Sequence, residues 1–166
     1  FPAAQKTREI RERGRKYMRT KIQNKTASAE IESLGAQLMS LKNAEGTEYL
    51  WQGNPAFWSS RAPVLFPTVG NVRGGTTIIN GKPYALKRHG FARNLEHSVL
   101  DSGANFIAYS LKDSEETRKL YPFVFELRVT YRLVESGLTT EFAVFNRGDE
   151  ELPFGIGGHP GFRCPL

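Results

Sequence analysis

The amino-acid sequence predicts an all-β protein, and three observations support that fold class. Short segments in which apolar and polar residues alternate recur along the chain, separated by turn residues. Phe and Tyr, which favour strands, are common, at 11 and 6 residues. Beyond residue 26, helix signals are confined to one turn after Ser114. With 166 residues, about nine short strands indicate one β-sandwich or barrel domain.

The first 26 residues differ from the rest in charge. Residues 1–26 carry nine basic and two acidic side chains, whereas residues 27–166 carry 14 basic and 15 acidic ones. Ile10, Tyr17 and Ile22 have an imperfect helical spacing. We therefore expect 1–26 to be a basic extension, disordered or helical, ahead of a domain spanning 27–166. A solvated appendage, an arm that contacts RNA or a membrane, and a mis-assigned upstream segment remain open interpretations of it.

In the first half of the domain, turn signals separate the expected strands. Residues 29–34 and 36–42 predict two strands, and a hairpin-type turn at 43–46 leads to an apolar segment at 49–51. Two prolines in 61–67 argue against a central strand there. We expect this loop to cover one end of a sheet, with Arg61 either pointing into a cleft or held in an ion pair.

The second half contains the clearest hairpin signal. Asn80-Gly81 follows an apolar run and predicts a two-residue turn. Ser114 is placed to cap a single helical turn that ends before Pro122. The remaining expected segments are strands at 96–100, 105–111, 123–133 and 138–146, with turns at 101–103 and 135–137.

Two histidines have settings typical of functional sites. His89 lies in KRHGFAR, between two basic residues and a glycine, and His159 lies in GGHPGF. Imidazole exchanges a proton near neutral pH, and the guanidinium groups of Arg88 and Arg93 suit oxygens of a polyol or a phosphate. The two motifs together predict one proton-handling pocket, although a structural role for each histidine remains open. His97, within a strand pattern, is a weaker candidate.

Several function classes lack their signals in this sequence. It contains no nucleophile elbow, no phosphate-binding glycine loop and no His/Cys cluster with metal spacing. No apolar run has membrane-spanning length. The single cysteine, Cys164, has no partner for an internal disulfide, which favours a reducing, cytoplasmic setting. We expect neither a cofactor nor a metal.

Five motifs, in order from about residue 31 to residue 166, resemble those of the aldose 1-epimerase (galactose mutarotase) family, especially its LacX-like branch. They are WQG at 51–53, Trp58 with RAPVLFP at 61–67, RHGFAR at 88–93, YPF at 121–123 and GHPGF at 158–162. The resemblance implies a galactose-mutarotase-like β-supersandwich. It also implies an enzyme that interconverts the α and β anomers of an aldose without cofactor or metal.

The resemblance also implies roles for individual residues. In such enzymes a carboxylate takes the proton from the anomeric hydroxyl while a histidine protonates the ring oxygen, so that the ring opens and closes again on its other face. His159 resembles this general acid, His89 the histidine that contacts the sugar near the ring oxygen, and Arg61 a contact to a substrate hydroxyl. Arg88 and Arg93 are secondary contacts, to a sugar phosphate or as braces of the loop.

One part of the family pattern has no match here. The family's catalytic carboxylate lies well past the HPGF-like motif, and no residue in 27–166 corresponds to it. We therefore expect a truncated domain with impaired activity, whose exposed sheet edges favour self-association. Two other interpretations remain, a non-catalytic carbohydrate-binding β-sandwich and a protein that binds nucleic acid through residues 1–26.

Overall fold

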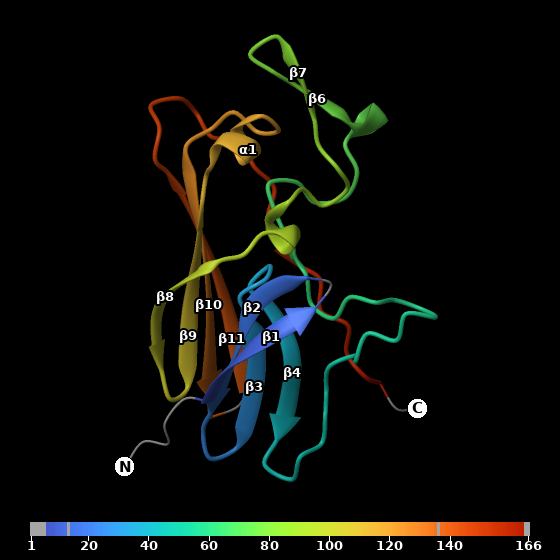
Figure 1. Ribbon diagram of the computed structural model, residues 1–166, viewed down its shortest axis with the longest axis vertical. Coiled ribbons are helices and arrows are strands. Elements are labelled where there is room, and N and C mark those ends of the chain that lie inside the picture. The colour runs from blue at the N-terminus through green and yellow to red at the C-terminus, as the bar shows by residue number, and fades with distance from the viewer. Residues whose placement is uncertain (1–5, 13, 136, 165–166) are drawn as a thin grey trace.

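The computed structural model describes residues 6–12, 14–135 and 137–164, and two antiparallel sheets form its body (Figure 1). The first sheet has the order β1-β2-β3-β4, formed by β1 (Lys6–Glu12), β2 (Arg15–Gln23), β3 (Ala27–Glu32) and β4 (Gln37–Asn43). The second has the order β11-β10-β9-β8, formed by β8 (Ser98–Gly103), β9 (Phe106–Lys112), β10 (Phe125–Val134) and β11 (Gly137–Asn146). The expected all-β class is confirmed.

Shorter elements connect and cap the two sheets. A two-stranded pair joins β5 (Val64–Leu65) to β12 (Gly157–Gly158), and a hairpin is formed by β6 (Thr76–Ile79) and β7 (Lys82–Ala85). The helical pieces are η1 (Arg73–Gly75), η2 (Ala92–Asn94) and α1 (Glu115–Arg118). The expected cap of the helical turn is present, because Ser114 Oγ accepts the Thr117 N–H at 3.2 Å.

The core lies between the inner faces of the two sheets. Successive side chains of a strand point to opposite faces, so every second residue of β10 is directed inward. The first sheet contributes Ile22 and Ile31, both fully buried, to the same cluster. The hydroxyl of Tyr131 on β10 crosses the core and donates to the Ala36 carbonyl at 2.8 Å. The inward residues of β10, all buried, are Phe125, Leu127, Val129, Tyr131 and Leu133.

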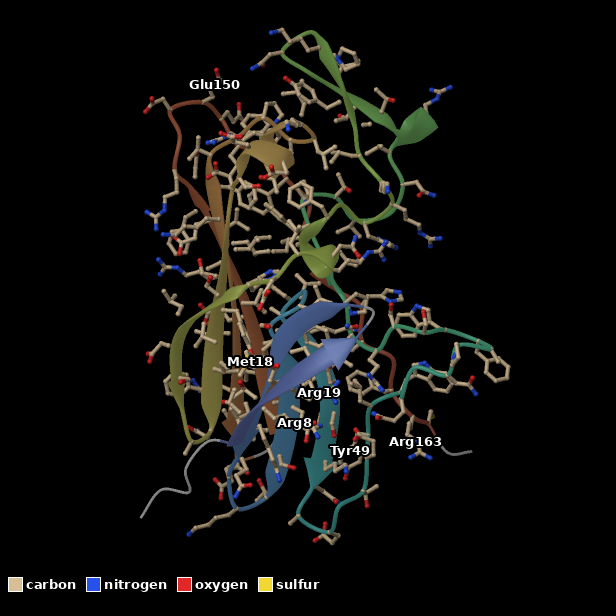
Figure 2. All side chains as sticks on the ribbon, in the orientation of Figure 1. Arg8, Met18, Arg19, Tyr49, Glu150 and Arg163 are labelled. Atoms are coloured by element: carbon tan, nitrogen blue, oxygen red, sulfur yellow. The ribbon has the colours of Figure 1, made fainter. Side chains whose placement is uncertain are left out.

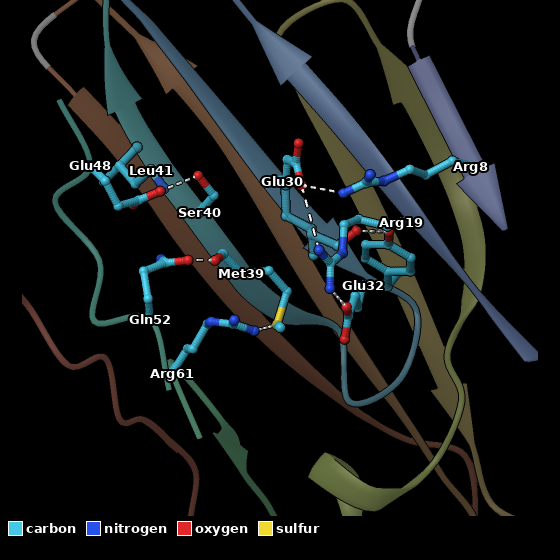
Figure 3. Close-up of polar contacts among 12 residues, drawn as sticks. Arg8, Arg19, Glu30, Glu32, Met39, Ser40, Leu41, Glu48, Gln52 and Arg61 are labelled. Carbon is cyan, nitrogen blue, oxygen red and sulfur yellow. Dashed lines mark hydrogen bonds and ion pairs between the residues drawn. The ribbon is translucent and has the colours of Figure 1, made fainter. Parts of the chain in front are cut away.

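The expectation of a disordered or helical extension over residues 1–26 is wrong for the described part of that segment. Residues 19–23 of β2 pair with β3, and Tyr17 and Ile22 are buried. Arg19 contacts Glu30 and Glu32 on the neighbouring strand (Figure 3). Glu30 and Glu32, which neutralise Arg19, lie downstream in sequence on β3. The positive charge of residues 1–26 therefore gave no sign that a strand forms there.

Two expectations about turns had different outcomes. The Asn80-Gly81 turn is confirmed, with positive φ at both residues, as a tight hairpin turn needs. Asn80 also donates to Glu150 at 3.0 Å, which ties the projecting β6–β7 hairpin to the loop after β11, where Figure 2 labels Glu150. The turn expected at 101–103 is wrong, because β8 continues through Gly103 and pairs with β9, with a register irregularity between Val99 and Asp101.

A buried carboxylate on β10 predicts a loss of stability in acid. Glu126 accepts hydrogen bonds from Arg128 at 2.7 Å, from Arg147 at 2.7 Å and from Ser110 at 3.0 Å. The two guanidinium groups lower the pKa of Glu126 to about 2, below its usual value near 4.3. Glu126 therefore stabilises the fold above about pH 5, and this contribution is lost as the pH falls towards 2.

Both arginines are partly exposed, so we expect this contribution to be about 1–2 kcal/mol. Urea denaturation across pH 2 to 6 measures it. Glu126→Gln is expected to lose this component of the pH dependence, whereas Glu135→Gln, at an exposed position, serves as the control. If the unfolding free energies of the native protein and of Glu126→Gln change with pH in parallel, the Glu126 carboxylate does not cause this loss of stability in acid.

β11 forms an outer strand of the second sheet, since among the described strands it pairs only with β10. Unpaired N–H and C=O groups on such an edge can template pairing with another chain. Self-association through sheet edges stays a prediction, which the dependence of molecular mass on concentration tests.

Candidate active site

Residues 61–67 bring the two distant histidine motifs together. β5 pairs antiparallel with β12, with Gly158 opposite Val64, so His159 emerges beside this segment. On the other side, Phe66 forms a parallel bridge with Gly90, next to His89. The Pro-bounded stretch is therefore a short buried strand between the two motifs, and more central than the covering loop expected from its prolines.

The rings of His89 and His159 lie close to each other. Their centroids are 6.1 Å apart, with 36° between the ring planes. The structure thus brings together the two histidines for which the sequence predicted a shared pocket. His97 is elsewhere: it is 1% exposed, and its Nδ1 lies 3.1 Å from the Leu95 carbonyl oxygen. Burial lowers the pKa of His97 to about 4, as expected for a neutral structural histidine.

The backbone around His89 is shaped for close approach to Phe66. His89 and Gly90 both have left-handed conformations, with φ of 67° and 69°. A Cβ on Gly90 would lie 2.1 Å from the Phe66 carbonyl oxygen, so only glycine fits there. Non-glycine residues with positive φ are costly and concentrate at functional sites. His89 is further held by the Gly70 backbone, which contacts both its N–H and its ring.

Arg88 and Arg93 lie at the edge of the histidine pair. Arg88 Nε lies 3.1 Å from His89 Nε2, and Arg93 Nη2 donates to the Arg88 carbonyl at 3.0 Å. Through this hydrogen bond, Arg93 stabilises the loop that carries Arg88 and His89. Partial burial, then the charges of Arg88 and Arg93, and then His159, lower the pKa of His89 below its usual value. The site therefore favours a neutral imidazole at position 89.

Arg61 joins the site through its backbone more than through its side chain. Its carbonyl accepts the Gly161 N–H at 2.8 Å, and its N–H donates to Gln37 Oε1 at 3.2 Å. Its guanidinium is directed at the sulfur of Met39, 3.8 Å away (Figure 3). Its Nε is buried, and no hydrogen-bond partner is recorded for it within the described residues. Neither the expected cleft position nor an ion pair is seen for this side chain in that part of the chain.

An aromatic wall and a small cavity flank His159. The Trp58 ring packs edge-on against His159, with centroids 5.2 Å apart, and Trp51 Nε1 donates to the Trp58 carbonyl at 2.7 Å. A cavity of about 220 Å³ adjoins His159. Its walls are mostly apolar, formed by Leu38, Ala62, Val64, Tyr131, Thr140, Phe142, Gly158 and Pro160. The aromatic residues of the two histidine motifs have different settings, since Phe91 is in the core and Phe162 is 60% exposed.

A larger cavity, of about 850 Å³, lies behind Arg88, beside the β6–β7 hairpin. Arg73, Lys87 and Arg88 are among its walls, but neither His89 nor His159 is. The smaller cavity therefore adjoins His159, whereas the larger one is lined by Arg88, which contacts His89. Sequence reasoning missed Arg73 and Gln37, which have no motif signal. Gly70 belongs to the motifs that carry the family resemblance, but its contact with His89 was not predicted.

Comparison with known proteins identifies the family. The family model for aldose 1-epimerase matches residues 18–166, which is most of the chain. The chain belongs to the aldose 1-epimerase family. The match begins within β2, which agrees with the position of this strand in the first sheet.

Individual relatives place the chain in the LacX-like branch of the aldose 1-epimerase family. Protein LacX (chromosomal) of Lactococcus lactis subsp. lactis is 37% identical over 155 residues, covering 90% of this chain and 52% of that protein. A galactose mutarotase related enzyme from Lactobacillus acidophilus superposes with a TM-score of 0.88 at 45% identity, covering 90% of this chain and 50% of that one. A galactose mutarotase-like protein from Lactobacillus casei gives 0.87 at 36% identity, covering 89% and 51%.

These relatives confirm the expected galactose-mutarotase-like fold. The chain spans about half the length of the curated relatives that it matches. The activity, substrates and partners of a whole aldose 1-epimerase are therefore proposals for this polypeptide.

Proposed function

We propose that this chain carries the proton-donating half of an aldose 1-epimerase site, which acts on the ring oxygen of a cyclic aldose or aldose phosphate. The observation that carries the proposal is the 6.1 Å separation of the His89 and His159 rings. The two residues are about 70 positions apart in sequence, and each lies in a motif that resembles the family. A shared pocket of two imidazoles suits general acid catalysis near neutral pH.

His159 is the proposed general acid. It is exposed, and the edge of Trp58 limits its ring on one side. A proton given to the sugar ring oxygen opens the ring, and the same proton returns to imidazole when the ring closes on the other face. The apolar cavity beside it suits one face of a pyranose ring, because C–H groups of sugars pack on apolar walls. His89 is the proposed hydrogen-bond partner of the same ring oxygen or of a neighbouring sugar oxygen.

Arg88 and Lys87 are the proposed contacts for a phosphate group, if the aldose carries one. Both line the larger cavity, and Arg88 also approaches His89, so a phosphate on a sugar held by the histidines can reach them. A charge-assisted bond from a guanidinium to phosphate is typically worth about 1.5–3 kcal/mol, or at least tenfold in affinity. Arg61 is a proposed contact to a sugar hydroxyl, which requires its guanidinium to turn away from Met39.

Calorimetry with matched ligands tests the proposal. We expect glucose or galactose to bind with a Kd on the order of 1 mM, because a small polar ligand makes few net-favourable contacts. Sorbitol, an open-chain polyol without a ring oxygen, is expected to bind at least about tenfold more weakly. Equal binding of glucose and sorbitol would contradict a site built for the cyclic form. Glucose 6-phosphate is compared with glucose in the same way. Tighter binding of the phosphate ester that is lost in Arg88→Met would show that Arg88 binds the phosphate group.

Calorimetry beside an anomerisation assay separates the alternative of a non-catalytic carbohydrate-binding domain. For that alternative, cyclic sugars should bind while exchange between the α and β anomers stays at the rate measured in buffer. As for other partners, no helix in the described parts of the chain is long and apolar enough to cross a membrane. Binding of nucleic acid through the basic N-terminal strands has no supporting observation beyond their charge.

A further inference from the structure

The structure holds His89 through a reciprocal pair of hydrogen bonds with Gly70. The His89 backbone N–H donates to the Gly70 carbonyl at 2.8 Å, and the Gly70 N–H donates to His89 Nδ1 at 3.0 Å. A backbone N–H can only donate, so Nδ1 must be the acceptor and carries no hydrogen. The single hydrogen of a neutral imidazole then lies on Nε2.

We propose that Gly70 is a positioning residue that fixes His89 as a neutral imidazole with its hydrogen on Nε2, a permanent hydrogen-bond donor that does not transfer its proton. This assignment deepens the proposed function, and rests on it for the identity of the acceptor, a sugar oxygen. It gives the two histidines different tasks. No hydrogen bond to the ring nitrogens of His159 is recorded in the described part of the chain, and this ring exchanges the proton.

A competing contact favours the opposite tautomer. Arg88 Nε lies 3.1 Å from His89 Nε2, and a guanidinium only donates, so this contact needs Nε2 to be the acceptor. A neutral ring has one acceptor nitrogen and cannot serve both donors. The Gly70 amide belongs to a backbone that is fixed by the second hydrogen bond, whereas Arg88 is exposed and its long side chain has room to turn away from the ring. The Gly70 amide therefore decides the tautomer.

The consequence is a pair of converging donors. With the hydrogen on His89 Nε2, the Arg88 Nε–H that points at this nitrogen must turn aside, and one oxygen acceptor between the two side chains can then satisfy both N–H groups. A sugar hydroxyl, a ring oxygen or a phosphate oxygen has this chemistry, and an ammonium or a guanidinium does not. The pair therefore selects for an oxygen acceptor at this point of the site.

A charged imidazolium at position 89 is disfavoured by the same geometry. A second hydrogen on Nδ1 would face the Gly70 N–H and break that hydrogen bond. The neighbouring groups Arg88 and Arg93 are cationic, and their charges oppose a second positive charge on the ring. Burial and these neighbours lower the pKa of His89, in agreement with a ring that stays neutral at pH 7.

Nitrogen NMR of the sugar-free chain, with ¹⁵N-labelled histidine, tests the assignment. Long-range ¹H–¹⁵N correlations show which ring nitrogen carries hydrogen, and His97 is an internal reference. Its Nδ1 faces the Leu95 carbonyl oxygen and must carry the hydrogen. We expect opposite patterns for His89 and His97 in one spectrum, with the favoured tautomer of His89 in excess by at least about ten to one. The variants His89→Gln and His159→Gln assign the signals.

A second readout observes the hydrogen bond itself. Uniform ¹⁵N labelling should show a coupling across the bond between the Gly70 amide nitrogen and His89 Nδ1. Arg88→Met should leave the tautomer unchanged. A hydrogen on Nδ1 of His89, a doubly protonated ring at pH 7, or a tautomer that changes in Arg88→Met would each overturn the proposal. Because no sugar is present, these outcomes are independent of whether the chain binds or converts an aldose.

Discussion

Gly90→Ala is expected to destabilise the protein by about 3–5 kcal/mol, a large effect for one methyl group. A Cβ at this position would lie 2.1 Å from the Phe66 carbonyl oxygen and 2.6 Å from the Pro67 nitrogen. Both contacts are with backbone atoms, so no side-chain rotation relieves them. The φ of 69° adds the cost of a left-handed conformation, about 1–2 kcal/mol. The bridge between Phe66 and Gly90 must open, which moves His89 away from His159.

Gly46→Ala separates the two costs. Gly46 also has a positive φ, of 88°, but a Cβ there meets no atom within 4 Å. Its substitution should therefore cost only the conformational part, about 1–2 kcal/mol. Urea denaturation of both variants measures the difference, provided that the slope with denaturant is unchanged. Similar losses of unfolding free energy in Gly90→Ala and Gly46→Ala would show that the Phe66 backbone does not exclude a Cβ at position 90.

The 166-residue chain by itself is expected to convert anomers about 10²–10⁴-fold more slowly than a full-length aldose 1-epimerase. The resemblance places the family's catalytic carboxylate beyond the HPGF-like motif, and no residue in 27–166 matches it. In the proposed function no positioned base acts, so the proton of the anomeric hydroxyl passes to water. The histidine pair supplies only the acid half of the proposed reaction, and we expect a low rate.

Exchange NMR of freshly dissolved α-galactose measures this rate. A full-length aldose 1-epimerase at the same concentration is the positive control, and His159→Ala is the matched variant. Turnover comparable to that of the full-length enzyme that disappears in His159→Ala would show that the chain holds a working base. A rate equal to that of His159→Ala is the result expected if the base contributes nearly all of the acceleration.

Local sequence signals predicted those elements whose cause is local. The Asn80-Gly81 turn and the Ser114 cap depend on residues within a few positions, and both are present. The strand at residues 15–23 was missed because its stabilisation comes from β3, including the acids Glu30 and Glu32. Such matching across a sheet is not visible in the charge of the segment alone.

The candidate site shows the same division. Motif resemblance was enough to select His89 and His159, which the structure brings together. It did not predict the direction of the Arg61 guanidinium, which depends on packing against Met39. It also did not predict the contact of the Gly70 amide with the His89 ring, because a backbone N–H leaves no signature in the residue type. Contacts made by backbone atoms at a site are therefore the part that sequence reasoning finds least.

His89 and His159 are proposed to contact one sugar together. A titration of the ¹⁵N-histidine-labelled chain with galactose, observed on the ring signals, tests this contact. We expect the signals of His89 and His159 to shift together with a single Kd, while those of buried His97 stay constant. Shifts of only one of the pair, two different Kd values, or saturable sugar binding that leaves both rings unchanged would contradict it.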